Sequence, residues 1–478
     1  MQKKFISNLI LLVILNLIVK PVSIFGIDAT VQNRVGAADY GLYFSLLNLT
    51  FLFNIILDLG INNFTTKNIA QYPHIVKRYI GKLLSFRLVL FVVYTFITLI
   101  LAVFLDHTER AFSILYLLIF NQFLVVLIAY FRSHFAGLLM FKTDAFISVL
   151  DRFLLIFICG YLLFFSTSDF SIETFVWTQT IAYFITFLIT LSWLFLKIGI
   201  PKISFHWIFS IAIIKKSLPF ALLVLLMMIY TRSDTVLLER LHPNGSFEAG
   251  IYAQGFRLLD AFFIFGMLFA TLLFPLFSRQ LKDKESIFPL LKMSSNLLIG
   301  GAVFISMFCV FNASFIVNSI YTHNTELSIP SFNWLMLTFV WMCFSLIFGT
   351  LLTANGSLKM LNQMSFIAIL LNITLNSSLI PRFGAEGAAI TAFSTQLFVV
   401  IVQLITVFRV FKISIHFKQV VKYLFFILSL LGLFILTSDN LSETSKIIIQ
   451  LFTGLILLFL FKLIDLKGLV SLLREKTN

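Results

Sequence analysis

The chain has 478 residues, of which 60% are hydrophobic and 12% are charged, and its mean hydropathy is +1.01. Soluble proteins are about half apolar and a quarter charged, so this composition excludes a soluble globular protein and predicts an integral membrane protein. The net charge of +14 is spread thinly over short segments between apolar runs. This pattern argues against nucleic-acid binding and for topology signals and contacts with anionic lipids.

Apolar runs predict fourteen membrane-spanning helices, because one span needs about 20 apolar residues. The first run follows Lys3 and Lys4 and is too long for a signal peptide, with no cleavage site after it. No alternating pattern of about ten residues suggests a barrel, so we expect an all-α protein. The predicted spans are 5–27, 41–65, 80–105, 112–135, 145–166, 172–196, 217–240, 250–278, 290–317, 329–353, 361–381, 385–408, 419–437 and 445–465.

Lysine and arginine are unevenly divided between the two sides of this topology. With the N-terminus inside, the inner segments hold 25 of them and the outer loops hold 5. The outer ones are Arg34, Arg110, Arg240, Arg382 and Lys446. Because positive residues are retained on the cytoplasmic side, we predict a multi-pass protein with both termini in the cytoplasm.

Short connections leave no room for a soluble catalytic domain. Outer loops such as DHTER, STSDFS and SDNLSETS are turn-sized, and the sequence has no phosphate-binding glycine motif. The cysteines lie in apolar runs without metal-ligand spacing: Cys159, Cys309 and Cys343. We therefore predict that the protein is not an enzyme and has no metal site or cofactor, with a multispan membrane glycosyltransferase as the less favoured alternative.

The first span contains an unusual charged step, Lys20 followed by Pro21. A charge near the bilayer centre costs about 3 kcal/mol on insertion scales, so such residues usually face a protein interior or water. Proline cannot donate a backbone hydrogen bond and bends a helix, so Pro21 is a predicted hinge. The alternative is a lysine that extends to the outer interface beside a merely structural proline.

Three arginines with a predicted binding role also reach membrane depth. Arg232 and Arg257 lie in the outer halves of spans 7 and 8, and Arg87 lies in the inner part of span 3. Arginine binds phosphate through two parallel charge-assisted hydrogen bonds, and lysine acts as a point charge. We predict that these arginines and Lys20 bind an anionic substrate, with Arg87 near the cytoplasmic entrance.

Carboxylates also lie at membrane depth. We predict coupling or gating roles for four of them: Asp28, Asp58, Asp234 and Asp260. Asp260 follows Arg257 by three residues, so these two could simply pair. Asp151 and Arg152 are adjacent and are expected to point in different directions, with no role assigned.

A weak internal repeat relates two stretches of the chain. GIDATVQNRVGAADYGLY and RSDTVLLERLHPNGSFEAGIY each carry an aspartate, a Thr-Val pair, a basic residue and a closing Gly-x-Tyr. Asp28 then corresponds to Asp234, and Gly41 to Gly250. Because six spans separate the two copies, the halves would share one orientation, as in transporters built from parallel repeats.

The segments that continue this repeat resemble a known family. Three stretches carry the resemblance: VGAADYGLYFSLLNLTFLFNIILDLGINNFTTKNIA, SDTVLLERL with AGIYAQGFRLLD, and PRFGAEGAAI. Together they are similar to Wzx-type polysaccharide and O-antigen flippases of the multidrug/oligosaccharidyl-lipid/polysaccharide (MOP) exporter superfamily. The resemblance implies two six-helix lobes in a MATE-like V. The two lobes would be residues 1–200 with spans 1–6 and residues 201–412 with spans 7–12. Residues 413–478 would add spans 13–14 and a cytoplasmic tail.

The same resemblance implies a flippase of the bacterial inner membrane. Its substrate would be an undecaprenyl-diphosphate-linked oligosaccharide, carried to the periplasmic leaflet by alternating access through a cationic cavity for O-antigen, capsule or exopolysaccharide synthesis. A proton or sodium ion and a polysaccharide polymerase are further candidate partners. The alternatives are a multidrug or organic-cation antiporter of the same superfamily, which would need an acidic pocket, and a lipid II flippase, which would share the helix plan.

Overall fold

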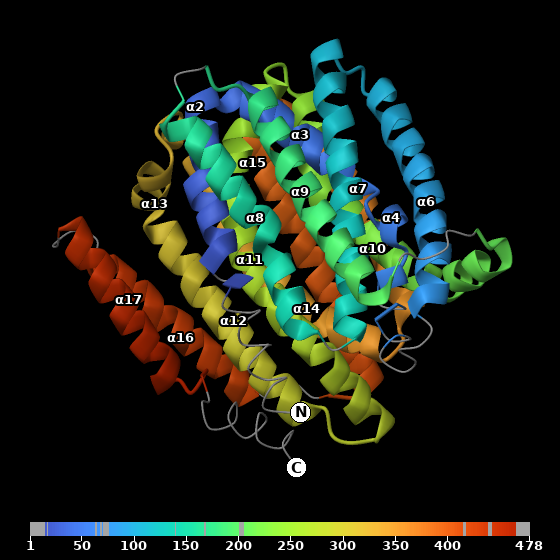
Figure 1. The fold of residues 1–478 in the computed structure, drawn as a ribbon. Coiled ribbons are helices and arrows are strands. Elements are labelled where there is room, and N and C mark those ends of the chain that lie inside the picture. Colours follow the sequence, from blue (N-terminus) through green and yellow to red (C-terminus); the bar gives the residue numbers. More distant parts are fainter. Residues whose placement is uncertain are drawn as a thin grey trace. The chain divides into compact units, whose positions relative to one another are not determined.

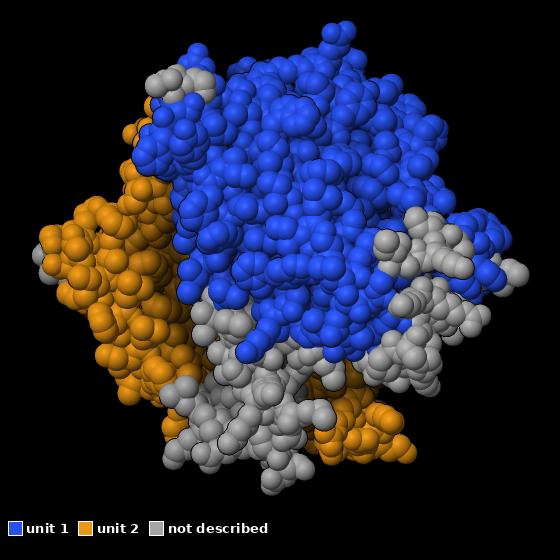
Figure 2. All heavy atoms as spheres, viewed as in Figure 1, with its two compact units in different colours: residues 1–250 blue, residues 251–478 orange. Residues whose placement is uncertain are grey.

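The computed structural model describes residues 15–16, 18–62, 65–66, 69, 76–138, 140–166, 169–199, 205–413, 417–437 and 442–464, and these contain helices and no strand. The predicted all-α fold is therefore confirmed. Lys3 and Lys4 lie outside the described residues. The chain divides into two compact units, Met1–Gly250 and Ile251–Asn478 (Figure 2), while the three predicted segments ending at residues 200, 412 and 478 stay a prediction.

Unit 1 is built around one buried helix, α3 (Ala37–Leu52), which packs against α7, α9 and α10 (Figure 1). Tyr40, Tyr43, Leu46 and Leu49 of this helix are almost completely buried. The other helices of this unit are η1 (Val22–Asp28), α2 (Ala29–Val35), α4 (Ile55–Asp58), α6 (Val76–Phe104), α7 (Glu109–Gly137), α8 (Phe141–Phe164), α9 (Ile172–Ile198), α10 (Trp207–Leu241) and the first turns of α11 (Gly245–Lys282).

The described part of unit 2 contains the rest of α11 and six further helices. They are α12 (Phe288–Phe311), α13 (Ala313–Ile320), α14 (Thr325–Ala354), α15 (Leu358–Phe411), α16 (Phe417–Leu436) and α17 (Glu443–Leu460). α14 packs against both α12 and α15, and the C-terminal pair α16 and α17 packs on α12.

α15 holds two of the predicted spans, because it bends sharply at Gly384. This residue has φ 52° and ψ −128°, a region that is open to glycine and strained for other residues. A Cβ on Gly387 would lie 2.5 Å from the carbonyl oxygen of Leu379, so the turn also needs glycine there. The PRFGAEGAAI segment is thus a tight connection between two helices.

Ten of the described helices are long and apolar enough to cross a membrane, so the predicted number of fourteen is not confirmed. One reason is that the predicted span 41–65 is broken: α3 ends at Leu52, and Leu59 has a φ of 44°. The break is tolerated because side chains bond the freed carbonyl groups. Tyr94 donates its hydroxyl to the Thr50 oxygen at 2.8 Å, and Arg87 donates to the Leu57 oxygen at 2.9 Å.

Candidate functional site

The Lys20–Pro21 step begins a π-helix rather than an ordinary bend. Pro21 has helical φ and ψ of −61° and −40° and caps the seven-residue π-helix η1. The wider hydrogen-bond spacing of a π-helix changes which side chains face inward, and such turns are frequent at functional sites. Ser23, Ile27 and Asp28 are buried by η1, while Lys20 is half-buried. The hinge role of Pro21 stays a prediction.

Four charged residues gather where η1 packs on α8: Lys20, Asp28, Asp151 and Arg152. The Arg152 Nε atom lies 3.8 Å from Asp151 Oδ2, so the expectation that these neighbours point in different directions was wrong. Asp151 and Arg152 act electrostatically on Lys20, and Asp28 acts on Arg152. We call this group the η1–α8 charge cluster.

Polar contacts hold the η1–α8 charge cluster in place. Asn16 donates from Nδ2 to Ser148 Oγ at 2.9 Å, which ties the first span to α8. At the edge of the cluster, Arg132 forms an ion pair with Asp144 at 2.7 Å. Because that pair balances its own charges, the cluster itself comprises two basic and two acidic residues, of which Asp28 is buried and the other three are half-buried.

Arg87 is almost completely buried, and its guanidinium is bound to the broken part of the second span. Nη2 donates to Asp58 Oδ1 and to Asn62 Oδ1, both at 2.7 Å, and Nη1 donates to the Leu57 oxygen. The Tyr130 ring centroid lies 4.6 Å from Arg87 Cζ. Both terminal nitrogens are thus engaged by the protein, and the substrate role of Arg87 and the coupling role of Asp58 stay predictions.

Arg232 and Asp234 lie on α10, which packs on α3. The Arg232 Cζ atom is 5.4 Å from the Phe51 ring centroid, and Nη1 makes a long 3.5 Å hydrogen bond to Asn48 Oδ1. Asp234 is buried, whereas Arg232 is half-buried. The partners of Arg232 named here thus lie on α3, whereas Lys20 belongs to the η1–α8 charge cluster.

In unit 2, Arg257 and Asp260 are both half-buried on α11. Their spacing of three residues places them on one face of that helix. Their predicted roles in substrate binding and coupling remain untested.

The two glycines that the repeat matched lie against each other. A Cβ on Gly41 would be 1.8 Å from the Ser246 carbonyl oxygen and 2.5 Å from the Gly250 nitrogen. The Gln32 side chain donates from Nε2 to the Gly250 oxygen at 2.7 Å. The backbones of α3 and of the first turns of α11 therefore meet without any side chain between them.

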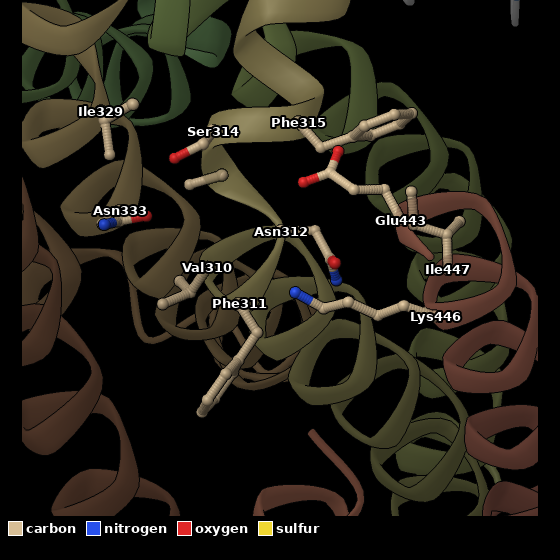
Figure 3. A pocket seen from close by; sticks show the side chains of 11 residues that line it. Val310, Phe311, Asn312, Ser314, Phe315, Ile329, Asn333, Glu443, Lys446 and Ile447 are labelled. Atoms are coloured by element: carbon tan, nitrogen blue, oxygen red, sulfur yellow. The ribbon is translucent and has the colours of Figure 1, made fainter. Parts of the chain in front are cut away.

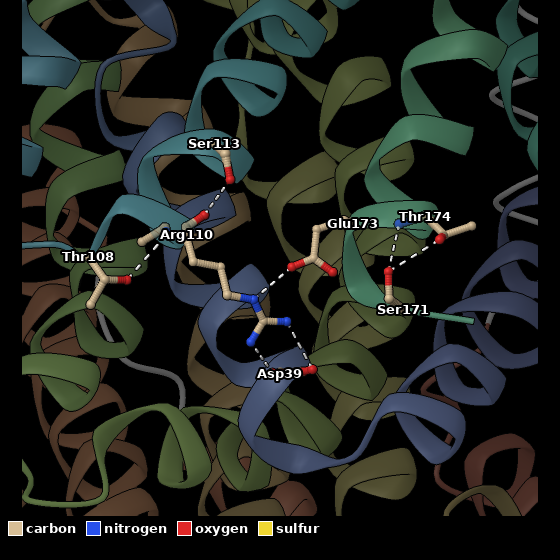
Figure 4. A network of polar contacts seen from close by, with 8 residues as sticks. Asp39, Thr108, Arg110, Ser113, Ser171, Glu173 and Thr174 are labelled. Carbon is tan, nitrogen blue, oxygen red and sulfur yellow. Dashed lines mark hydrogen bonds and ion pairs between the residues drawn. The ribbon is translucent and has the colours of Figure 1, made fainter. Parts of the chain in front are cut away.

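An ion-pair network joins α3, α7 and α9 (Figure 4). Arg110 binds Asp39 with two parallel hydrogen bonds of 2.8 and 3.1 Å and donates from Nε to Glu173 Oε1 at 2.7 Å. Thr108 and Ser171 cap the helices that carry Arg110 and Glu173, each accepting a backbone N–H at 3.3 Å. The caps fix the first turns of α7 and α9, so the three charged side chains converge.

A second polar group joins the loop before α7 to the end of α10. Arg240 donates from Nη2 to His107 Nδ1, and its Nε lies 2.9 Å from Glu239 Oε2. Burial and the neighbouring Arg240 charge lower the pKa of His107 to about 4. The imidazole is therefore neutral at pH 7, and its Nδ1 accepts a hydrogen bond from the Arg240 guanidinium.

The sequence predicts Arg110 and Arg240 in outer loops but does not predict either polar group. Their partners Asp39 and His107 lie 71 and 133 residues away along the chain, and no local spacing signals such a pairing. Acidic residues at the starts of α7 and α9, Glu109 and Glu173, are a local signal that charged side chains gather at these helix ends.

A family model described as "Polysaccharide biosynthesis protein" matches residues 5–281. The lipid II flippase MurJ, in an inward closed conformation, is similar in structure with a TM-score of 0.75 and 14% identity, covering 96% of this chain and 100% of that chain. A search of curated proteins gives no match.

Two further solved structures are similar over most of the chain. One is an inward-facing multidrug resistance MATE family transporter of the MOP superfamily, with a TM-score of 0.63, 14% identity, and coverage of 82% of this chain and 96% of that chain. The other is a MOP superfamily transporter from Pyrococcus furiosus, with a TM-score of 0.57, 14% identity, and coverage of 83% and 94%. At this identity the likeness shows a shared fold.

Proposed function

Because this chain belongs to the polysaccharide biosynthesis protein family, we propose that it is a flippase for undecaprenyl-diphosphate-linked oligosaccharides. It carries these units from the cytoplasmic to the periplasmic leaflet of the bacterial inner membrane, for O-antigen, capsule or exopolysaccharide synthesis. The observation that carries the proposal is the family match over residues 5–281, supported by a fold shared with MOP transporters along most of the chain.

The diphosphate is bound by cations at membrane depth. Lys20 and Arg232 are half-buried on η1's N-terminal side and on α10, and Arg257 is half-buried on α11. The long hydrogen bond from Arg232 to Asn48 is weak, so phosphate oxygens can replace it at little cost. Arg87 contributes only when its Asp58 pair opens, since both terminal nitrogens are otherwise engaged.

Carboxylates in the same helices couple transport to an ion gradient or hold a gate. Asp28 in the η1–α8 charge cluster and Asp234 on α10 are buried, and buried carboxylates are costly unless paired with a cation. A proton or a sodium ion that neutralises one of them shifts the balance of charge around Lys20 or Arg232. Asp58 and Asp260 are the further members of this proposed set.

A lipid II flippase is the second candidate, because the protein of that activity is similar over 96% of this chain. Its substrate would offer the same lipid diphosphate to the same cations. A multidrug antiporter is the third, favoured by the similarity to the MATE transporter and opposed by the basic residues among the charged groups.

Deletion and complementation separate these candidates. Loss of surface glycan with normal growth on deleting the gene supports the proposal, whereas loss of viability supports the lipid II role. Complementation with Lys20→Ala, Arg232→Ala or Arg257→Ala is expected to leave glycan export defective at normal protein level. Lys359→Ala, an exposed lysine in the first turn of α15, is the control and is expected to restore export.

Topology is tested separately, with reporter fusions at the two ends of the chain. A cytoplasmic reporter that is active at both termini agrees with the predicted orientation. A periplasmic reporter active at either end contradicts it.

A further inference from the structure

Unit 2 contains a cavity of about 380 Å³ that takes no part in the proposed transport site. It lies where α12 gives way to α13, and it is bounded by α14 and by the first turn of α17 (Figure 3). Phe311 and Phe315 line it together with polar and charged side chains from three different helices. A mixed lining of this kind, at the ends of helices long enough to span a membrane, fits an amphipathic ligand.

The two charged side chains of the cavity have opposite sign. Glu443 and Lys446 are three residues apart on α17, so they share one face of the helix, and Figure 3 shows both directed toward the cavity. Within the described part of the chain, neither side chain forms an ion pair or a hydrogen bond. A separate cation and carboxylate therefore remain available to a ligand.

Amides complete the lining. The Oδ1 atom of Asn333 is buried and accepts no hydrogen bond from the described residues, a costly state that a ligand donor would relieve. Asn312 is 4% exposed and donates to the Phe308 oxygen at 2.9 Å and to Gln450 Oε1 at 2.7 Å. These bonds connect the end of α12 to α17 at one wall of the cavity.

We propose that this cavity binds the headgroup of a phosphoethanolamine phospholipid. The phosphate accepts hydrogen bonds from the Lys446 ammonium, while the ethanolamine ammonium donates to the Glu443 carboxylate and to Asn333 Oδ1. Acyl chains then follow the apolar outer face of α17, where Ile448, Ile449 and Phe452 are exposed.

The acceptors in the cavity distinguish this headgroup from others. Glu443 and Asn333 Oδ1 both need a hydrogen-bond donor, and an ammonium group offers three. A choline headgroup offers none, and a glycerol headgroup brings no positive charge to the carboxylate. A lysine that merely extended to the interface would attract any anionic lipid and would prefer phosphatidylglycerol.

Native mass spectrometry of the full-length protein tests the proposal. The protein is equilibrated with equal amounts of phosphatidylethanolamine, phosphatidylglycerol and phosphatidylcholine that carry the same acyl chains. We expect one retained phosphatidylethanolamine, preferred roughly fivefold, because one charge-assisted contact is worth about 1 kcal/mol or more. Equal retention of the three lipids, or a preference for phosphatidylglycerol, overturns the proposal.

Variants locate the binding to the cavity. Glu443→Gln and Lys446→Met are each expected to remove the preference, and Glu443→Lys is expected to shift it to phosphatidylglycerol. Glu326→Gln and Lys359→Met change exposed charges in the first turns of α14 and α15, outside the cavity, and should keep it. An unchanged preference in Glu443→Gln or in Glu443→Lys contradicts the proposal. Because Glu443 is exposed, these two variants are expected to keep the wild-type melting temperature.

Discussion

Gly41 on α3 and Gly250 on α11 meet backbone to backbone. A Cβ on Gly250 would lie 1.9 Å from the Ala37 carbonyl oxygen, just as one on Gly41 would lie 1.8 Å from the Ser246 oxygen. Neither clash involves a flexible side chain that could turn away. The crossing thus requires glycine on both helices, and Gln32 closes it by donating to the Gly250 oxygen.

Gly41→Ala is therefore expected to destabilise the folded protein by about 2 kcal/mol or more, since backbone must move to admit the methyl group. The melting temperature of the purified protein measures this effect. Gly301→Ala is the matched control, because a Cβ on Gly301 meets nothing within 4 Å and alanine favours a helix. Equal melting temperatures for the two variants would contradict the tight crossing.

Arg87 gives a second prediction, which separates structural from substrate-binding roles. Arg87→Ala removes hydrogen bonds to Asp58, Asn62 and the Leu57 oxygen. It is expected to cost about 3 kcal/mol, because hydrogen bonds of a charged group are lost while Asp58, whose side chain is 24% exposed, can still reach water. Arg87→Lys should recover only part of this, since an ammonium group cannot reproduce the planar fork.

Protein level and melting temperature are the measurements for Arg87. If Arg87→Ala kept wild-type stability while export failed, the contacts described above would not be structural and the predicted substrate role would gain support. Asp58→Asn is expected to be milder, because the amide oxygen can still accept from Arg87.

His107 predicts a dependence of stability on pH. Its pKa is lowered from 6.5 to about 4 in the folded protein, so the unfolded chain binds a proton more readily below about pH 6.5. The contribution of His107 to stability is thus full above pH 6.5 and is lost as the pH falls toward 4. The facing groups are Arg240, Glu239 and Asp106.

Melting temperatures of wild type and His107→Gln between pH 8 and pH 4 check this point. The wild type should lose more stability than the variant over the range below pH 6.5, and the two curves should run parallel above it. His323→Gln, at an exposed histidine, should follow the wild type. Parallel curves for wild type and His107→Gln at all pH values would show that the histidine does not titrate as described.

Variants of the buried carboxylates Asp28 and Asp234 test whether transport is coupled to an ion gradient. Asp28→Asn and Asp234→Asn are expected to make glycan-lipid transport in vesicles insensitive to an imposed proton or sodium gradient, because the amide cannot be neutralised by a cation. Transport rates with and without each gradient are the measurement. Wild-type transport at the same rate with and without both gradients would contradict ion coupling.

Hydrophobic runs were enough to predict the all-α fold, and the order of degenerate motifs was enough to predict a polysaccharide biosynthesis family, both of which are confirmed. The likeness to MOP superfamily transporters shows the shared fold. Breaks inside the runs were not predicted. The chain is mostly apolar from 41 to 65, and the break there is stabilised from another helix: Tyr94 bonds the Thr50 carbonyl in α3, and Arg87 bonds the Leu57 carbonyl in α4. Such rescue depends on tertiary contacts and leaves no local pattern.

Which charged residues lie away from lipid was easier to predict from the sequence than which residues they pair with. The rule that charges avoid lipid selected Arg87, Asp58 and Asp28, which are buried or half-buried. It could not say that Arg87 binds Asp58 or that Asp151 lies beside its neighbour Arg152, since the choice of partner depends on helix rotation. Gly41 and Gly250 were matched as repeat equivalents, and their contact became visible only in three dimensions.

In the proposed function, cations at membrane depth carry a lipid-linked diphosphate sugar across the membrane. Purified protein in vesicles, supplied with a fluorescent undecaprenyl-diphosphate oligosaccharide, measures it directly as movement of the label between leaflets. We predict transport by the wild type and a loss of roughly tenfold or more in the Lys20→Ala, Arg232→Ala, Arg257→Ala triple variant, because each charged hydrogen bond to phosphate is worth about 1.5–3 kcal/mol. A folded triple variant that moved the lipid at the wild-type rate would contradict diphosphate binding by these cations.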